Sequence, residues 1–394
     1  MNINPFTEEH ELLRQSITKF CEKEIIPYVE EWEKNEHCEK SIFKKMGEKG
    51  FLGVSFPEEY GGGGMDFWGA VVVIQALANS NIAGLSMSLY AHTYLPLPLI
   101  AALGTQEQKE KYLIPALKGD KIAALGVTEP GAGSDVAGIK TTAVDKGDHY
   151  EINGSKMFIT NGNIADFVVI AAKTGEGLNM SMIIVDTDTE GFSSIKIDNK
   201  LGMHSSDTAQ LFFEKCVIPK TNLIGQEGHG FYYQMNNFQE ERLLAAITGT
   251  FVAEWSLEKA KKYCMEREAF GRPIGKFQVV RHKLAQMAIK VETCRSISFR
   301  AVAEFIEQGN KAETIITMAK AYTGEEAIKV INDSLQLHGG VGYTEDYGIA
   351  RAWRDARLLS IGGGTTEIMH EILGKVVLDQ VEHSDKMSKE TAKA

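Results

Sequence analysis

The residues best suited to chemistry begin with a glycine-rich segment, GVTEPGAGSDVAG, at positions 126–138. Gly131 and Gly133 carry no Cβ, so backbone N–H groups beside them can approach an anion closely. Thr128 and Ser134 add hydroxyl donors to the same segment. These residues suit a cofactor phosphate or the polar edge of a ring. On their own they also suit a tight surface turn, and both interpretations stay open at this point.

The spacing of these glycines does not match a nicotinamide-binding fingerprint. They do not follow the GxGxxG pattern, and no unit of strand, helix and strand surrounds them. A Rossmann domain is therefore not expected. A metal site is not expected either, because the ten histidines include no HExxH motif and the His37-Cys38 pair stands alone.

Two long motifs relate the sequence to a known family. TEPGAGSD at positions 128–135 resembles the first signature of the acyl-CoA dehydrogenases, and QLHGGVGYTEDYGIARAWRD at positions 336–355 resembles the second at every defined position. The motifs are independent, they stand in the family's order, and the chain has the family's length. By this resemblance the chain is identified as a member of that family over nearly its whole length.

The resemblance implies FAD as the cofactor and assigns part of its site to the middle of the chain. In KMFITNG at positions 156–162, Phe158 takes the place of the aromatic residue packed on the flavin, and Thr160 that of the hydroxyl near the reactive N5. Without the motif, Phe158 would be interpreted as a strand residue facing a core. The first signature and the residues before it imply contacts with the flavin ring and pyrophosphate through Leu125, Val127, Thr128, Gly133 and Ser134.

Other FAD contacts are implied in the last third of the chain. FGRPIGKFQ, with Arg267 before it, resembles the stretch that reaches across a dimer interface to the other subunit's FAD. The resemblance implies Arg267 at the pyrophosphate, where its planar fork can donate two bonds, and Phe270 and Gln278 at the nucleotide half. FAD binding thus implies at least a dimer, and the family's usual state is a dimer of dimers. The remaining implied contacts are Gln336, Gly340, Thr365 and Glu367.

The implied reaction needs a carboxylate that removes the α-proton of an acyl thioester while the β-hydrogen leaves as hydride. In many relatives this base lies in a C-terminal Tyr-Glu-Gly-Thr segment, but the aligned residues here are Gly362, Gly363, Gly364 and Thr365. Gly363 cannot remove a proton. One interpretation is that activity has been lost. The other is the arrangement of the isovaleryl and long-chain branches, in which a glutamate precedes an arginine on a central helix.

The segment QEERLLAA supplies such a pair as Glu241 and Arg242. We predict Glu241 as the catalytic base for two reasons. Gly363 has no side chain at the position where many relatives carry the base, and Glu241 stands where the isovaleryl and long-chain branches carry theirs. Burial in an apolar acyl cavity would raise its pKa toward the working range. The alternative is a solvated glutamate near a helix start, the role expected of Glu240. The predicted substrate contacts are Ser134, Arg242, Gly362 and Gly363.

Three successive patterns must position these residues. Helical periodicity begins after a plausible N-cap at Thr7 and predicts further helices at 41–49, 68–78 and 106–117. Short β-rich runs follow at 150–152, 156–159, 167–171, 181–185 and 211–213, with Asn153-Gly154 expected as a two-residue hairpin turn. Long helices are then expected at 240–265, 277–308 and 312–337.

We therefore predict an α+β fold like that of the acyl-CoA dehydrogenases. Its expected parts are an N-terminal helical domain (1–120), a middle β-barrel or sheet domain (121–230) and a C-terminal four-helix-bundle domain (231–394). The polar tail at 382–394 is expected to be disordered. The five cysteines include no CxxC pair and are expected as reduced core thiols: Cys21, Cys38, Cys216, Cys264 and Cys294.

The resemblance also implies a helix at about 86–100 as the floor of the acyl cavity. Small residues there, Ser86, Ser88 and Ala91, leave room for a long or branched tail. The simpler interpretation is core packing at helical spacing by the larger residues of this segment, Met87, Tyr90, Leu95 and Leu97.

Composition excludes several other classes of protein. The 42 basic and 53 acidic side chains give a net charge of −11 without long runs, so nucleic acid is not an expected partner. No stretch approaches the roughly 18 consecutive apolar residues of a membrane span, and the acidic start does not resemble a signal peptide. We expect a bacterial cytoplasmic protein or, if processed, one of the mitochondrial matrix.

The predicted function is FAD-dependent dehydrogenation of a long-chain or branched-chain acyl-CoA to the trans-2-enoyl-CoA, with electron-transfer flavoprotein as the acceptor. Two alternatives stay open. One is a flavin-dependent oxidase or monooxygenase of the same superfamily. The other is a flavin-binding or CoA-binding scaffold that has lost its active site.

Overall fold

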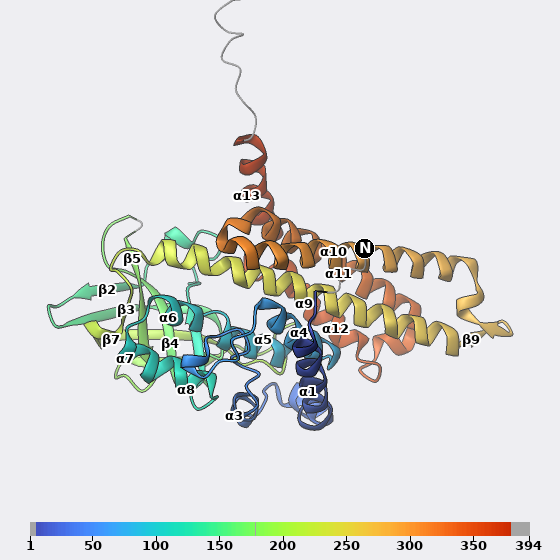
Figure 1. Ribbon diagram of the computed structural model, residues 1–394, viewed down its shortest axis with the longest axis horizontal. Helices are drawn as coiled ribbons and strands as arrows, with labels where there is room; N and C mark the ends of the chain where they lie inside the picture. The colour runs from blue at the N-terminus through green and yellow to red at the C-terminus, as the bar shows by residue number, and fades with distance from the viewer. Residues whose placement is uncertain (1–4, 178, 380–394) are drawn as a thin grey trace, which may run out of the picture.

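The computed structural model of the protein describes residues 5–177 and 179–379. Figure 1 shows an elongated molecule with strands gathered at one end and long helices running toward the other. The tail at 382–394, predicted to be disordered, lies outside the described residues.

The N-terminal part of the chain is helical. Thr7 is the N-cap of the first helix, and its N–H donates to His10 Nδ1 at 3.1 Å in a capping box. The helices are α1 (Glu8–Glu24), α2 (Val29–Asn35), α3 (Ser41–Glu48), α4 (Phe67–Asn79), α5 (Ala83–Thr93), α6 (Leu97–Leu103), α7 (Gln106–Gln108) and α8 (Ile114–Leu117).

The expectation of one helix over residues 86–100 is wrong. The chain forms α5 and α6 with a break between them. Pro96 has no N–H, and its ring would clash with the carbonyl four residues earlier in a continuous helix. The break leaves the Leu95 carbonyl free to accept a hydrogen bond at 2.7 Å from Asn237, which ties this turn to the C-terminal part of the chain.

The middle of the chain forms an eight-stranded sheet in the order β6-β7-β3-β2-β4-β5-β8, with β1 pairing parallel to β4. Helices α6 and α8 share a hydrophobic core with strands β1, β4 and β5. The strands are β1 (Ala123–Gly126), β2 (Thr142–Asp145), β3 (His149–Thr160), β4 (Phe167–Lys173), β5 (Met180–Asp186), β6 (Phe192–Lys196), β7 (Thr208–Pro219) and β8 (Leu223–Ile224).

The predicted hairpin turn at Asn153-Gly154 is wrong. Both residues lie inside β3, which pairs along its whole length with the single strand β7. The pairing register shifts between Ile152 and Gly154, where Gly154 has a φ of +148°. The dipeptide therefore forms a β-bulge and not a turn, because one long partner strand holds both flanking runs in the same ladder.

The C-terminal part of the chain is built on long helices that approach one another closely. Gly249 lies on the helix Gly230–Glu266, and Thr323 lies on the helix Glu313–His338. A Cβ placed on Gly249 would lie 2.9 Å from Thr323 Cγ2, so the close packing here requires glycine. The helices are α9 (Gly230–Glu266), α10 (Gln278–Gln308), α11 (Glu313–His338), α12 (Ile349–Ala356) and α13 (Thr366–Asp379).

Helix α9 begins at Gly230, well before the expected start at residue 240. Its first turns are rich in aromatic and asparagine residues, which are modest helix formers. Phe231, Tyr233 and Phe238 nevertheless pack against the core shared by the sheet and α6. Tertiary packing therefore extends the helix and places residues 240 and 241 in its interior.

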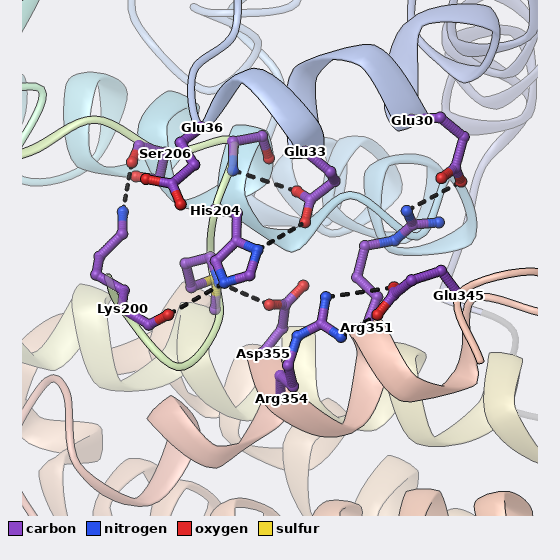
Figure 2. Close-up of polar contacts among 12 residues, drawn as sticks. Glu30, Glu33, Glu36, Lys200, His204, Ser206, Glu345, Arg351, Arg354 and Asp355 are labelled. Atoms are coloured by element: carbon purple, nitrogen blue, oxygen red, sulfur yellow. Dashed lines mark hydrogen bonds and ion pairs between the residues drawn. The ribbon is translucent and has the colours of Figure 1, made fainter. Parts of the chain in front are cut away.

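A polar junction joins the three parts of the chain (Figure 2). Asp355 of α12 accepts a hydrogen bond at 2.6 Å from the N–H of Met203, which precedes β7. Glu33 of α2 accepts at 3.2 Å from the N–H of Ser205. Arg351 of α12 pairs with Glu30 at 3.1 Å. These six residues are called the three-domain junction below. Their contacts join α2 and α12 to the loop before β7, and they join α12 directly to α2.

Two further expectations can be compared with the fold. The five cysteines are buried and unpaired, which confirms their interpretation as core thiols. Within residues 5–177 and 179–379, no helix combines the length and apolar character that crossing a bilayer requires.

Candidate active site

Glu241 of α9 faces Gly363, which lies between the 3₁₀ helix Arg357–Ser360 and α13. A Cβ placed on Gly363 would lie 3.5 Å from Glu241 Oε1 and 3.6 Å from its Cγ. Gly363 also has a φ of +64°, a conformation that favours glycine. A side chain at position 363 would therefore stand in contact with the carboxyl of Glu241.

The surroundings of Glu241 shift its protonation equilibrium. Burial raises the pKa of its carboxyl to about 7, and the positive charges of Arg242 and Lys320 oppose that rise. No hydrogen bond contributes to the shift. A carboxyl with this pKa can accept and release a proton near neutral pH.

Glu240 is not the solvated, helix-opening glutamate that we expected. It lies in the interior of α9, its side chain is half-buried, and burial raises its pKa to about 7. Its charge acts on Tyr94, at the turn between α5 and α6. Adjacent helical residues point about 100° apart, so the two carboxyls face different surroundings. A raised pKa alone therefore does not tell Glu240 from Glu241.

Two buried cations lie near Glu241. Arg242 is 6% exposed, and its Nη1 lies 3.7 Å from Glu313 Oε1. Lys320 of α11 is 1% exposed and donates a hydrogen bond to the carbonyl of Gly364. Sequence reasoning missed Lys320. The available signal was a lysine between two alanines, Ala319 and Ala321, on the apolar face of a helix.

Phe158 stands at a second bulge of β3, where the pairing with β7 shifts between Lys156 and Ile159. Its φ is +59°, which is strained for a bulky residue, and its side chain is 62% exposed. The alternative interpretation of Phe158 as a core-facing strand residue is therefore wrong. The bulge turns an aromatic ring out of the sheet, as bulges beside functional sites often do.

A buried ion pair fastens the glycine-rich segment to β3 near Phe158. Lys156 is 0% exposed, and its Nζ donates at 2.8 Å to Glu129 and at 3.2 Å to the Val127 carbonyl. Burial alone would raise the pKa of Glu129, but the Lys156 ammonium outweighs it and the pKa is lowered. The Thr128 carbonyl accepts from the N–H of Met157 at 2.8 Å. Sequence reasoning missed this pair, although Glu129 lies inside the first motif.

These contacts bring one group of predicted cofactor residues together. Leu125, Val127 and Thr128 run beside the β3 segment that carries Phe158 and Thr160. Beyond them Gly133 and Ser134 are exposed, and a Cβ on Gly133 would meet no atom within 4 Å. An exposed ring beside an open, glycine-rich backbone fits a flavin and its phosphates.

A second group lies at the opposite end of the molecule. Strands β9 (Glu268–Ala269) and β10 (Arg272–Pro273) form a short hairpin whose tip, Phe270, is 95% exposed. Figure 1 shows this hairpin and the eight-stranded sheet at opposite ends. His338, at the end of α11, stacks on Tyr263 of α9 at 4.5 Å between ring centroids. The exposed residues of this group are Arg267, Phe270, Gln278, Gln336 and Gly340.

A third group surrounds Glu241. It contains Gly362 and Gly363, and the Thr365 hydroxyl, which accepts from the N–H of Ile368 at 3.3 Å at the start of α13. Thr365 and Glu367 border a cavity of about 300 Å³ against α11. One chain therefore brings the base candidate and the α13 start together, but separates them from the hairpin group.

Comparisons with known proteins cover nearly the whole chain. Models of the N-terminal, middle and C-terminal domains of acyl-CoA dehydrogenase match residues 7–120, 124–216 and 228–378. The chain is 38% identical to a 3-(aryl)acrylate reductase of Clostridium sporogenes, over 95% of this chain and 99% of that one. It is also 38% identical to the rat mitochondrial long-chain specific acyl-CoA dehydrogenase, over 95% of this chain and 87% of that one.

A solved structure gives the same result for the fold. The crystal structure of an acyl-CoA dehydrogenase from Geobacillus kaustophilus matches with a TM-score of 0.92 and 40% identity, over 95% of this chain and 99% of that one. The predicted fold class, helical at both ends with a sheet between, is confirmed.

Proposed function

The chain belongs to the acyl-CoA dehydrogenase family, and we propose that it converts a long-chain or branched-chain acyl-CoA to the trans-2-enoyl-CoA with Glu241 as base. Like the family, it is an FAD-dependent oxidoreductase that acts on acyl-CoA. The proposal for the base rests on one observation: the Glu241 carboxyl lies 3.5 Å from where a Cβ at Gly363 would be.

FAD, when bound, supplies the acceptor for the hydride that leaves the β-carbon. The exposed ring of Phe158 would pack on the flavin, and Thr160 would donate to it. The open backbone at Gly131, Gly133 and Ser134 would donate N–H groups to its polar edge and phosphates, whereas the N–H groups of Glu129 and Ala132 bond each other's carbonyls. The buried Lys156–Glu129 pair holds that backbone in place.

Glu241 takes up the α-proton of the thioester. The electron pair of the broken Cα–H bond becomes the new Cα=Cβ bond as the β-hydrogen departs with its own pair. With a pKa of about 7, Glu241 is a stronger base than an ordinary carboxylate yet remains largely ionised just above neutral pH. Arg242 and Lys320 favour that ionised state, whereas a bound thioester that excludes water opposes it.

The acyl chain is proposed to be long or branched for two reasons. A glutamate before an arginine on the central helix is the arrangement of the long-chain and isovaleryl branches, and the rat long-chain enzyme is among the similar proteins. Helix α5 contributes the small residues Ser86, Ser88 and Ala91, all buried. The Ser88 hydroxyl donates to Ser206 at 3.2 Å and so faces the middle domain, which leaves Ser86 and Ala91 as the candidates for shaping an acyl cavity.

We also propose that two copies complete each FAD site, because the hairpin group is too far from Phe158 to serve the same cofactor within one chain. A dimer of dimers would then be the full assembly. An electron-transfer flavoprotein is the proposed acceptor, in the cytoplasm of a bacterium or in a mitochondrial matrix. Rapid peroxide formation without another acceptor would favour the oxidase alternative instead.

Anaerobic titration with a panel of acyl-CoAs tests the proposed function. Straight chains of increasing length and branched chains are added to the yellow protein, and the flavin absorbance near 450 nm is followed. A dehydrogenase bleaches with its substrates, and the rate constants rank them. A protein that keeps its colour with every thioester would be a scaffold.

A second candidate activity is the reverse reaction, reduction of an α,β-unsaturated acid derivative. The similarity to the 3-(aryl)acrylate reductase favours it. Protonated Glu241 would then deliver its proton to the α-carbon. Anaerobic addition of enoyl-CoA or 3-arylacrylate to the pre-reduced protein distinguishes the two directions, since only a reductase regains its colour faster with the acrylate than with the enoyl thioester.

A further inference from the structure

Lys320 is a buried lysine with no part in the family motifs. It is 1% exposed, although a lysine is seldom buried without a partner. It lies on α11, and the segment that it contacts lies between the 3₁₀ helix Arg357–Ser360 and α13. Its Nζ donates to the carbonyl of Gly364, the residue after Gly363. The lysine thus reaches the segment that faces Glu241.

The Gly362–Gly364 segment needs such a fastening. Gly363 and Gly364 have φ values of +64° and +92°, so the backbone has no preferred conformation of its own there. A carbonyl withdrawn from water needs a donor, and the Lys320 ammonium supplies one to the partly buried carbonyl of Gly364. The hydrogen bond therefore fixes how close Gly363 comes to the carboxyl of Glu241.

Lys320 also acts electrostatically on Glu241. Its positive charge lowers the pKa of Glu241, and the negative charge of Glu241 raises that of Lys320 in return. Burial nevertheless leaves the pKa of Lys320 lowered, at about 8. The other charge that acts on Glu241 is that of Arg242 on its own helix. Glu313 on α11 acts in turn on Arg242, and Glu367 on α13 acts on Lys320.

We propose that Lys320 is a positioning residue for the catalytic base: it holds the Gly362–Gly364 segment against Glu241, and its charge favours the ionised carboxylate. The proposal rests on the proposed function, in which Glu241 removes the α-proton. Arg242 does not duplicate this role, because its guanidinium lies toward Glu313 and no hydrogen bond joins it to the glycine segment among the described contacts.

Two variants isolate the contribution of the lysine's charge. Lys320→Gln keeps a hydrogen-bond donor but removes the charge, and Lys320→Arg keeps both. The control is Lys290→Met. It breaks the ion pair between Lys290 on α10 and Glu326 on α11, which is far from the glycine segment in sequence. The rate constant of anaerobic flavin bleaching at saturating acyl-CoA is measured from pH 5.5 to pH 9.5 for each holoenzyme.

For Lys320→Gln we expect the acidic limb of the pH profile to move up by about one pH unit, because an opposite charge nearby is lost. At pH 6 the bleaching rate should fall about tenfold, and near pH 9.5 it should approach that of the wild type. Lys320→Arg and Lys290→Met should keep the wild-type midpoint. A Lys320→Gln profile that superimposes on the wild type, or that drops equally at every pH, would overturn the proposal.

If Lys320→Gln does not retain FAD, a measurement of stability still tests whether Lys320 acts on Glu241. The midpoint of thermal unfolding of the apoprotein is compared in a cycle of Lys320→Gln, Glu241→Gln and the double variant. We expect Lys320→Gln to lower the midpoint less in the Glu241→Gln background than in the wild type. Equal losses in both backgrounds would show that the lysine does not act on the glutamate. Bleaching by Glu241→Gln itself would instead refute the proposed base.

Discussion

Two carboxyl groups of this protein, those of the buried Asp355 and the half-buried Glu241, have the same raised pKa in different surroundings. Asp355 at the three-domain junction is 3% exposed, and burial together with the charge of Glu33 raises its pKa to about 7. Its Oδ1 is held by the N–H of Met203, with Arg351 close by. Glu241 also has a pKa of about 7, but it faces a glycine and is held by no hydrogen bond that shifts its pKa.

The difference shows what a raised pKa can and cannot indicate. Burial is the largest cause of the raised pKa at Asp355, at Glu240 and at Glu241, so the shift marks desolvation and not function. Both Asp355 and Glu241 lie beside a glycine, since a Cβ on Gly202 would be 2.6 Å from Asp355 Oδ1 and one on Gly363 would be 3.5 Å from Glu241 Oε1. The Asp355 oxygen already accepts from the N–H of Met203, whereas no hydrogen bond is among the causes of the pKa shift of Glu241. A base needs both a suitable pKa and a face that a substrate can reach.

The largest expected effect is that of Glu241→Gln. The amide keeps the size of the side chain but accepts no proton, so bleaching by acyl-CoA should slow by about a thousandfold or more. FAD content and the unfolding midpoint should stay close to those of the wild type. Glu240→Gln is the matched control and should retain most of the rate. If the control were the slower variant, the assignment would pass to Glu240.

Moving the carboxyl to the other side of the shared space should recover part of this loss. Glu241→Thr with Gly363→Glu should bleach about 10- to 100-fold faster than Glu241→Thr alone. Recovery stays incomplete because a non-glycine residue at the φ of +64° is strained by roughly 1–3 kcal/mol. No recovery in a double variant that still binds FAD would argue against a shared cavity.

The pH dependence of the wild-type enzyme gives a smaller effect. Glu241 must be ionised to accept a proton, and its pKa is about 7. Below that pH the bleaching rate should fall about tenfold per unit, and above it the rate should level off. Stopped-flow traces across the range measure this midpoint. A rate that is flat down to pH 5 would mean that the base titrates as an ordinary carboxyl.

The smallest expected effect is that of Asp355→Asn, which should change stability and leave activity within about twofold. The folded-state pKa of Asp355 is raised from 3.8 to about 7, so the wild type loses stability as pH rises between these values. The amide does not titrate and can still accept from Met203. At pH 8 it should unfold about 2–4 °C above the wild type, with the gain vanishing near pH 4. Scanning calorimetry at both pH values checks this, and an equal difference at both would refute the linkage.

Much of the fold and part of the site follow from local signals in the sequence. Helical periodicity and β-rich runs predict the order of the three parts, and the family resemblance of KMFITNG and FGRPIGKFQ leads to Phe158 and Phe270. Glu241 and Gly363 were paired through the family resemblance, and they lie together in space. Their roles remain predictions that the variants above test.

What the sequence did not predict depends on partners distant along the chain. Asn153-Gly154 has the composition of a turn, but the whole of β7 pairs across it and makes it a bulge. Glu240 was expected at the start of a helix. Packing on the sheet extends α9 back to Gly230 and places Glu240 in its interior. Lys156 is buried with Glu129, and Lys320 against the Gly364 carbonyl, so the partner of each lysine lies far from it in sequence.

The position of the β9–β10 hairpin has a consequence for inheritance. If each hairpin serves the FAD of a neighbouring copy, a chain with Arg267→Ala damages its partner's site and leaves its own intact. Mixing that chain with a Glu241→Gln chain would give dimers in which one site carries both defects and the other carries none. Two inactive alleles would then complement each other, and the activity of a mixed population would exceed that of either parent.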